Sequence, residues 1–411
     1  MTHLLRAGLL LAALLLAGCA PRGADAPPAA APATVADDAA LVARGRELAL
    51  IGNCAGCHTA PGGAPYAGGL AIPTPFGPTY AGNLTPEVRT GLGRWTREDF
   101  WTALHEGRAR DGRPLVPTFP YTSYTHVRRE DSDALFAYLR SLPAVHQPDR
   151  PHELRFPFGS AVVLRAWQWL FFEPADLAAD EAARRALPER AARGAYLVQG
   201  LGHCGACHAP RNAFGAPSGA LTGGEMSLQG WTAPSLHPRA GDAGHAEEMA
   251  ALLRAGQTAR STVLGPMADV VYRSLQHWPP ADIAAVADFL ARLPPEPAPA
   301  AAPADAAQLD RGRAVYGEQC ADCHGRDGEG AGTAYPALAG NPTVLQPSPR
   351  NLVQVVRFGG FAPVTAANPR PYGMPPASLS DADTAAVLSF VRQSWGNRAG
   401  AVSALDVLKL Q

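Results

Sequence analysis

The 411-residue sequence has room for two to four domains, and its 35 Lys and Arg residues nearly balance its 36 Asp and Glu residues. No basic block occurs, which disfavours binding to nucleic acid. The 42 Gly and 40 Pro residues favour short helices joined by long loops around a cofactor, because a cofactor can supply apolar surface that side chains would otherwise provide.

The N-terminus has the features of a secretory signal. Arg6 precedes an apolar run over residues 9–16, and a small-residue cleavage site follows. Cys19 comes directly after this site and resembles the lipidated cysteine of a bacterial lipobox; the alternative is a plain signal peptide with a leftover cysteine. We expect residues 1–18 to be removed and Cys19 to be acylated, so that the mature chain is a membrane-anchored lipoprotein facing the periplasm. The run is too short for a conventional spanning helix.

Three copies of Cys-x-x-Cys-His follow, at residues 54–58, 204–208 and 320–324. This spacing is the attachment signature of a c-type haem, because two thioethers on one helical turn hold the porphyrin while the adjacent His ligates the iron. Three copies use six of the seven cysteines, which leaves little room for a zinc or disulfide alternative. We predict three covalently bound haem c groups. The attachment residues would be Cys54, Cys57, Cys204, Cys207, Cys320 and Cys323, and the proximal iron ligands would be His58, His208 and His324.

Each motif lies between two predicted helices. The first carries an Arg-Gly pair, and the second begins with a capping or acidic residue and has apolar residues at three- and four-residue steps. This order of helix, motif, long loop and C-terminal helix is the layout of a small class I cytochrome c domain. We predict an all-α fold of three tandem domains of this class, with long loops wrapped around covalent haems. The pairs are Arg44-Gly45, Arg193-Gly194 and Arg311-Gly312, and the C-terminal helices are expected at residues 131–140, 281–292 and 380–392.

Composition indicates the boundaries between these domains. Residues 19–38 and 297–306 are rich in Pro and Ala and are predicted to be a tether and a linker. The connecting segment 151–187 is different, because residues 156–172 are rich in Phe and Trp. It could be a helix packed across the domains, or a docking surface for a partner subunit or the membrane interface, where Trp is favoured. The predicted domains are residues 39–150, 188–296 and 307–411.

The sixth ligand of each iron decides its chemistry, since His/Met ligation raises the potential and closes the iron to substrates. Met374 stands in Gly-Met-Pro-Pro before the third C-terminal helix, and Met267 follows Gly-Pro before the second. A loop Met next to Pro is how such a ligand is usually held, so we predict both as iron ligands. Met226 lies close after its motif, and Met249 lies in a helical run that favours core packing.

The first domain contains no Met. Phe119 stands where the pattern would place the ligand, and Phe cannot bind iron. A histidine or an open iron position remains. Of His105, His126 and His146, the preferred candidate is His126, because it lies just before the C-terminal helix.

Stretches beyond the motifs carry a family resemblance. They are Pro75-Phe-Gly77, Asn83-Leu-Thr-Pro86, Thr90-Gly-Leu-Gly-Arg-Trp95, Asp99-Phe100, Gly194-Ala-Tyr-Leu-Val198, Cys207-His-Ala-Pro-Arg-Asn212, Met374-Pro-Pro376 and Ser394-Trp-Gly-Asn397. With these the chain resembles the three-haem cytochrome c subunit of membrane-bound bacterial dehydrogenases that act on alcohols, gluconate and related sugars or aldehydes. The resemblance covers nearly the whole mature chain and supports Met267 and Met374 as ligands. It would also supply a Met in the first domain, where this chain departs with Phe119.

The resemblance and the motifs together predict an electron-transfer subunit. It would carry electrons from a partner periplasmic-side dehydrogenase through three c-type haems to quinone or a terminal oxidase. No flavin, pyrroloquinoline quinone or molybdenum site is visible in the sequence, so catalysis is expected in a large partner subunit, which would be a quinoprotein, a flavoprotein or a molybdenum enzyme. An alternative is a peroxidase-like haem enzyme or small-ligand binder that uses an open first haem.

Overall fold

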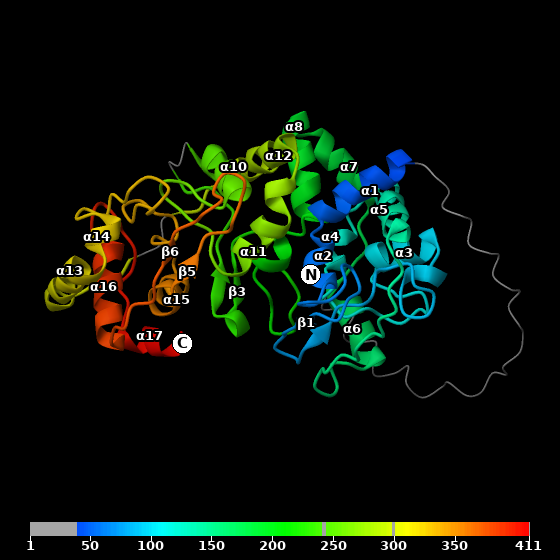
Figure 1. The fold of residues 1–411 in the computed structure, drawn as a ribbon, viewed down its shortest axis with the longest axis horizontal. Helices are drawn as coiled ribbons and strands as arrows, with labels where there is room; N and C mark the ends of the chain where they lie inside the picture. The colour runs from blue at the N-terminus through cyan, green and yellow to red at the C-terminus, as the bar shows by residue number, and fades with distance from the viewer. Residues whose placement is uncertain (1–38, 241–243, 298–300, 411) are drawn as a thin grey trace, which may run out of the picture. The chain divides into compact units, whose positions relative to one another are not determined.

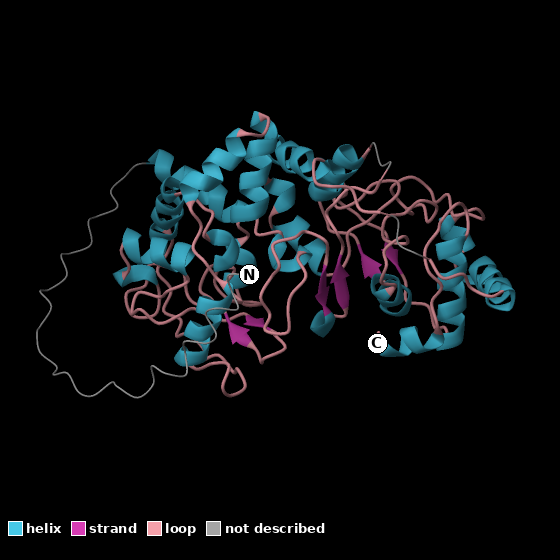
Figure 2. Cartoon of the chain, turned by 180° about the vertical axis from the view of Figure 1, so that it is seen from behind, coloured by secondary structure: helices cyan, strands magenta, loops and turns pink. Residues whose placement is uncertain are grey.

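The computed structural model describes residues 39–240, 244–297 and 301–410. The predicted signal peptide, Cys19, the tether and part of the second linker lie outside these residues. Within them the chain consists of helices and long loops with three small two-stranded antiparallel sheets (Figures 1 and 2), which confirms a mainly helical fold. None of the helices in these ranges has the length and apolar character needed to cross a membrane.

The elements follow the predicted order. The first repeat comprises α1 (Ala39–Ile51), α2 (Cys54–His58), β1 (Ala71–Ile72), β2 (Thr79–Tyr80), η1 (Leu92–Arg94), α3 (Arg97–Glu106), α4 (Tyr121–Tyr124) and α5 (Arg129–Ser141). The connecting segment forms α6 (Ala161–Phe171) and α7 (Leu177–Arg185). The second repeat comprises α8 (Glu189–Tyr196), η2 (Leu197–Leu201), α9 (Gly205–His208), β3 (Gly224–Met226), η3 (Ser227–Gln229), β4 (Trp231–Ala233), α10 (His245–Ala255), α11 (Pro266–Arg273), η4 (Leu275–His277) and α12 (Pro280–Ala291). The third comprises α13 (Ala306–Gln319), α14 (Ala321–His324), α15 (Arg350–Phe358), β5 (Gly360–Phe361), β6 (Gly373–Met374), α16 (Asp381–Gln393) and α17 (Ala404–Lys409).

One close helix crossing occurs in all three repeats. The Gly of each predicted Arg-Gly pair lies against the backbone of the C-terminal helix, and a Cβ atom at that position would overlap a carbonyl oxygen of that helix. Glycine therefore allows the two helix backbones to approach more closely than any other residue would. The contacts join α1 to α5, α8 to α12 and α13 to α16 (Figure 1) and are made by Gly45 on Ala134, Gly194 on Ala285 and Gly312 on Ala386.

The arginine before each glycine binds the first turn of the same C-terminal helix. Arg193 donates two hydrogen bonds of 2.8 Å to the Asp282 carboxylate. The corresponding Arg–Asp distances are 3.3 Å for Arg44 to Asp131 and 2.7 Å for Arg311 to Asp383. A carboxylate near a helix N-terminus is also favoured by the helix dipole. The ion pair and the glycine contact together fix the crossing of the two helices in each repeat. The motif turn directly follows the first of these helices, so the crossing sets its position.

The hydrophobic interior is divided unevenly among the repeats. One core contains buried residues of the first and second repeats together, including Leu48 and Leu135 from the first and Leu197 and Val286 from the second. A separate core belongs to the third repeat and includes Val353. The first two repeats therefore depend on each other for burial of apolar surface, whereas the third has its own core.

The aromatic connecting segment forms α6, which packs against both of its flanking repeats. The indole of Trp167 is buried, donates a hydrogen bond of 2.9 Å to the Phe214 carbonyl and packs edge-on against Tyr121. The opposite side of the helix leaves Val162 77% exposed and Trp169 49% exposed. The prediction of a helix packed across the repeats is confirmed, and this helix has a second apolar face at the surface.

The helix crossing can be tested with two glycines of α13. Gly312→Ala should lower the free energy of unfolding by about 1–3 kcal/mol, because overpacking a close contact forces the helices apart. Gly317→Ala in the same helix is the matched control, since nothing lies within 4 Å of a Cβ at that position. The control should be neutral or stabilising by up to about 1 kcal/mol. Denaturant unfolding followed by circular dichroism measures both, and equal effects of the two substitutions would contradict the crossing.

Candidate haem-binding sites

The three motifs form short helical turns, α2, α9 and α14, at the ends of the first helices. In each motif the first Cys is partly buried and the second is exposed, and none of the six is in a disulfide. Burial raises the pKa of Cys54 to about 12 and that of Cys320 to about 11. Among the described residues, no group of three or more His, Cys, Asp or Glu side chains is arranged to hold a metal ion.

The histidine that ends each motif is held in the same way in all three repeats. The Nδ1 atom bonds a backbone carbonyl at 2.7 Å in His58, 2.7 Å in His208 and 2.9 Å in His324. A carbonyl oxygen can only accept, so Nδ1 carries the proton, and burial lowers the pKa of each ring and keeps it neutral. The Nε2 lone pair is then available for iron, the tautomer that a histidine ligand needs. The residues present fit a covalently attached haem with a histidine ligand.

The two predicted methionine ligands both follow closely on a glycine that packs on an aromatic ring. Met267 lies in the first turn of α11, after Gly265, which has φ 57° and lies against the Trp231 ring. Met374 lies in β6, after Gly373, whose Cα lies against the Phe361 ring. Both methionine side chains are partly buried, and that of Met267 also packs against the first core.

Met267 and Met374 thus lie in regular elements and not in the loops expected for them, and Met226 and Met249 of the second repeat also lie in regular elements. Met226 is paired with Trp231 at the end of β3. Met249 lies in α10 and packs against the first core, as its helical pattern predicts.

In the first repeat, Phe119 packs among aromatic side chains. Its ring lies 5.3 Å from that of Tyr124. His105 stacks on Trp101, and its Nδ1 bonds the Thr125 carbonyl at 2.9 Å. His126 is partly exposed, and its Nδ1 bonds the Asp180 carboxylate of α7 at 2.6 Å. In both histidines Nδ1 is occupied, so only Nε2 could ligate an iron.

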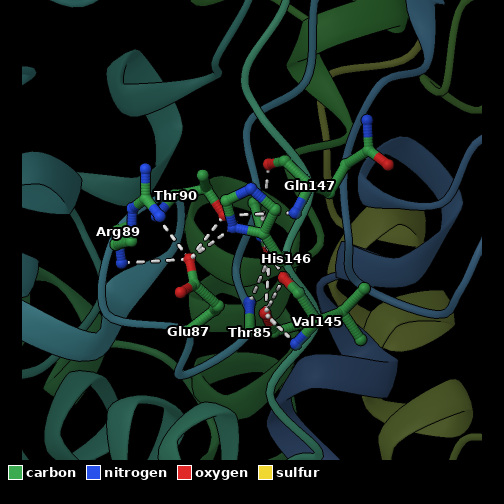
Figure 3. A network of polar contacts seen from close by, with 8 residues as sticks. Thr85, Glu87, Arg89, Thr90, Val145, His146 and Gln147 are labelled. Atoms are coloured by element: carbon green, nitrogen blue, oxygen red, sulfur yellow. Dashed lines mark hydrogen bonds and ion pairs between the residues drawn. The ribbon is translucent and has the colours of Figure 1, made fainter.

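His146 lies in a polar surface network that involves neither a motif cysteine nor a motif histidine (Figure 3). Its side chain is 55% exposed, and its Nδ1 lies 3.6 Å from the Glu87 carboxylate. Hydrogen bonds from Thr90, from the backbone of Arg89 and from His146 lower the pKa of Glu87 to about 2. This arrangement explains His146 as a partner of a surface carboxylate.

One partly buried histidine, His203, is not singled out by the sequence pattern. His203 directly precedes Cys204, and its Nδ1 bonds the Leu201 carbonyl at 3.0 Å. Its ring lies 5.5 Å from that of Tyr124 in the first repeat. The sequence does show a histidine next to a motif cysteine, but only the fold shows that it faces the first repeat.

Each repeat combines a Cys-x-x-Cys-His turn, a histidine with a fixed tautomer and the same helix crossing. These features together define a c-type cytochrome. The Cytochrome c family model matches residues 42–143 and 309–395, which lie in the first and third repeats. The chain belongs to this cytochrome c family, among the cytochrome c subunits of dehydrogenases.

Three relatives illustrate the family. The cytochrome c subunit of alcohol dehydrogenase (quinone) from Gluconobacter oxydans is 37% identical over 91% of this chain and 83% of its own length. The gluconate 2-dehydrogenase cytochrome c subunit of Pantoea cypripedii is 36% identical over 92% of both chains. A diheme cytochrome c-type protein of Cereibacter sphaeroides is 37% identical over 69% of this chain and 96% of its own. The predicted resemblance is confirmed, as is the role of an electron-transfer subunit in place of a catalytic one.

The two methionine ligands can be tested by substitution. Met267→His and Met374→His should each lower one haem potential, within the roughly 0.8 V range that axial ligands impose, because the thioether that raises the potential is lost. Covalent haem content should stay the same. Met249→His is the control, because Met249 lies in α10 and is not predicted to bind iron, so its substitution should leave the haem potentials unchanged. A redox titration that is unaltered for either ligand variant would reject that methionine.

Proposed function

We propose that this chain is the electron-transfer subunit of a dehydrogenase complex and carries three covalent haem c groups. One observation carries the proposal. The same site is built three times, from a Cys-x-x-Cys-His turn, a histidine whose Nδ1 is bound to a carbonyl, and a helix crossing closed by glycine. Bound haem c supplies a one-electron iron couple. The division into three cytochrome c domains at residues 39–150, 188–296 and 307–411 is part of the proposal.

The chain's own residues would set the properties of each site. His58, His208 and His324 offer Nε2 in the neutral tautomer, because Nδ1 of each ring donates to a backbone carbonyl. Met267 and Met374 would close the second and third irons and favour their reduced state. These roles require no acid–base catalyst in this chain, which fits a subunit that moves electrons for a separate catalytic subunit.

The relatives support a catalytic dehydrogenase as the partner, since several are named as cytochrome c subunits of dehydrogenases. A quinone acceptor is supported by the alcohol dehydrogenase (quinone) subunit, and a terminal oxidase is the alternative acceptor. We further propose that acylated Cys19 anchors the chain to a membrane on the periplasmic side. The lipobox-like sequence supports this anchor.

A second candidate function rests on Phe119. If the first iron has no sixth ligand, that site could bind a small ligand or act as a peroxidase-like centre. Phe119 favours this candidate because its aromatic ring lies where the pattern expects a ligand and cannot bind iron.

Purification of the full chain from its native membrane tests the proposed function. A large dehydrogenase should co-purify, and its substrate should reduce the haems of this chain. A chain that purifies alone, with haems that no dehydrogenase preparation reduces, would contradict the proposal.

Carbon monoxide separates the two candidate functions in the same preparation. An electron-transfer subunit with three closed irons should show no change in the spectrum of the reduced protein. Binding at one iron, together with peroxide turnover, would favour the second candidate.

A further inference from the structure

The first and second motifs lie next to each other. A Cβ at Gly52, just before the first motif, would lie 3.2 Å from the Leu201 side chain, just before the second. The entry turns of the two motifs therefore form part of one interface.

The residues directly before the second motif have an unusual backbone conformation. A π-helical turn, η2, ends α8, and it contains Gly200 with non-helical dihedral angles. His203 follows with φ 40°, a left-handed conformation that is uncommon outside glycine, although histidine adopts it more often than most residues do. Asn53 holds the same place before the first motif with φ 48°, and asparagine tolerates this conformation well. A backbone conformation of this kind persists only where surrounding contacts enforce it. The contacts of the His203 ring therefore explain why the backbone adopts this conformation.

The ring of His203 is placed against the first repeat. It lies 5.5 Å from the Tyr124 ring at an interplanar angle of 65°. Its Nδ1 donates to the Leu201 carbonyl, and burial lowers its pKa, so the ring is neutral. A neutral aromatic ring covers apolar surface without bringing a charge into the interface.

Tyr124 connects this ring to the first motif. Its hydroxyl lies 3.5 Å from the Gly52 carbonyl, and its ring packs on Phe119. The side chain is buried, which raises its pKa, and the nearby Cys54 and Cys57 thiols raise it further. Tyr124 thus stands between His203 on one side and the first attachment thiols on the other.

We propose that His203, the residue directly before the second motif, closes the first haem site across the repeat boundary. With Tyr124 it keeps water away from the edge of the site at Cys54, and so raises the potential of the first haem. Exclusion of water has this effect because ferric haem carries one more positive charge than ferrous haem, and a dry site disfavours that charge. The inference rests on the proposed haem at the first motif. His203 is a positioning residue, since it acts through Tyr124.

A separate contact should keep the two repeats docked when His203 is changed. The Ser274 hydroxyl of the second repeat donates a hydrogen bond of 2.6 Å to the Leu50 carbonyl of the first. The Trp278 indole in turn donates to the Ser274 hydroxyl at 2.9 Å. These bonds do not involve His203.

His203→Asn in the full haem-loaded chain tests the proposal, because Asn53 shows that asparagine fits this backbone. The ferric-to-ferrous ratio of the first haem at a fixed potential should rise about tenfold, which is a fall of about 59 mV for a one-electron couple. The other two midpoints should not move. Variants at Met267 and Met374 assign those two midpoints, which leaves the third to the first haem.

His237→Asn is the matched control. His237 also bonds a carbonyl through Nδ1, at 2.8 Å to Pro294, and its hydrogen bonds are to residues outside both motifs. Its substitution should leave all three midpoints unchanged. Tyr124→Leu opens the same edge from the first repeat and should lower the same midpoint, so the proposal stays testable if the His203 variant fails to fold.

An unchanged first midpoint in a folded His203 variant or Tyr124 variant would overturn the proposal, as would a shift of the second midpoint alone. A His203 variant that is less stable but has an unchanged first midpoint potential would show that His203 only packs, and this result would also overturn the proposal. The proposed function fails differently, since the unsubstituted chain would then carry no haem at the first motif.

Discussion

The approach of two helix backbones at a glycine is the constraint on which each haem site depends. Gly45, Gly194 and Gly312 permit the approach, and an Arg–Asp ion pair beside each glycine orients it. The motif turn follows directly from the first helix of the crossing. Its two thiols and its histidine are therefore placed by backbone contacts, before any cofactor is considered. This explains how repeats with little sequence in common can build the same site.

Much of this arrangement could be predicted from the sequence. The motifs, the Arg-Gly pairs and the periodic C-terminal helices are local patterns, and local patterns set helices and turns. The role of the Arg-Gly pairs could not be predicted, because it depends on a contact between helices that are far apart in the chain. The sequence also left open whether the aromatic segment packs across the repeats or forms a docking surface, and only the burial of Trp167 against Phe214 shows that it packs.

The surroundings of the haem site in the first repeat could not be predicted from local sequence patterns. Phe119 marks the missing methionine. His146 contacts the Glu87 carboxylate, whereas His105 and His126 bond other groups through Nδ1 and keep Nε2 available. His203 is separated from this repeat by the whole connecting segment and comes beside Tyr124 only through the shared core. A core shared by two repeats makes their haem sites dependent on each other, whereas the third repeat has a core of its own.

The central claim is that one chain builds the same covalent haem site three times. Mass spectrometry of the denatured mature protein tests it most directly, because thioether-bound haem survives unfolding and a metal ion or a loosely bound haem does not. The account predicts a mass increase of three haem groups, and one group fewer when both cysteines of any single motif are replaced by alanine. A natural chain with fewer than three haems, or a motif whose loss leaves the mass increase unchanged, would contradict it.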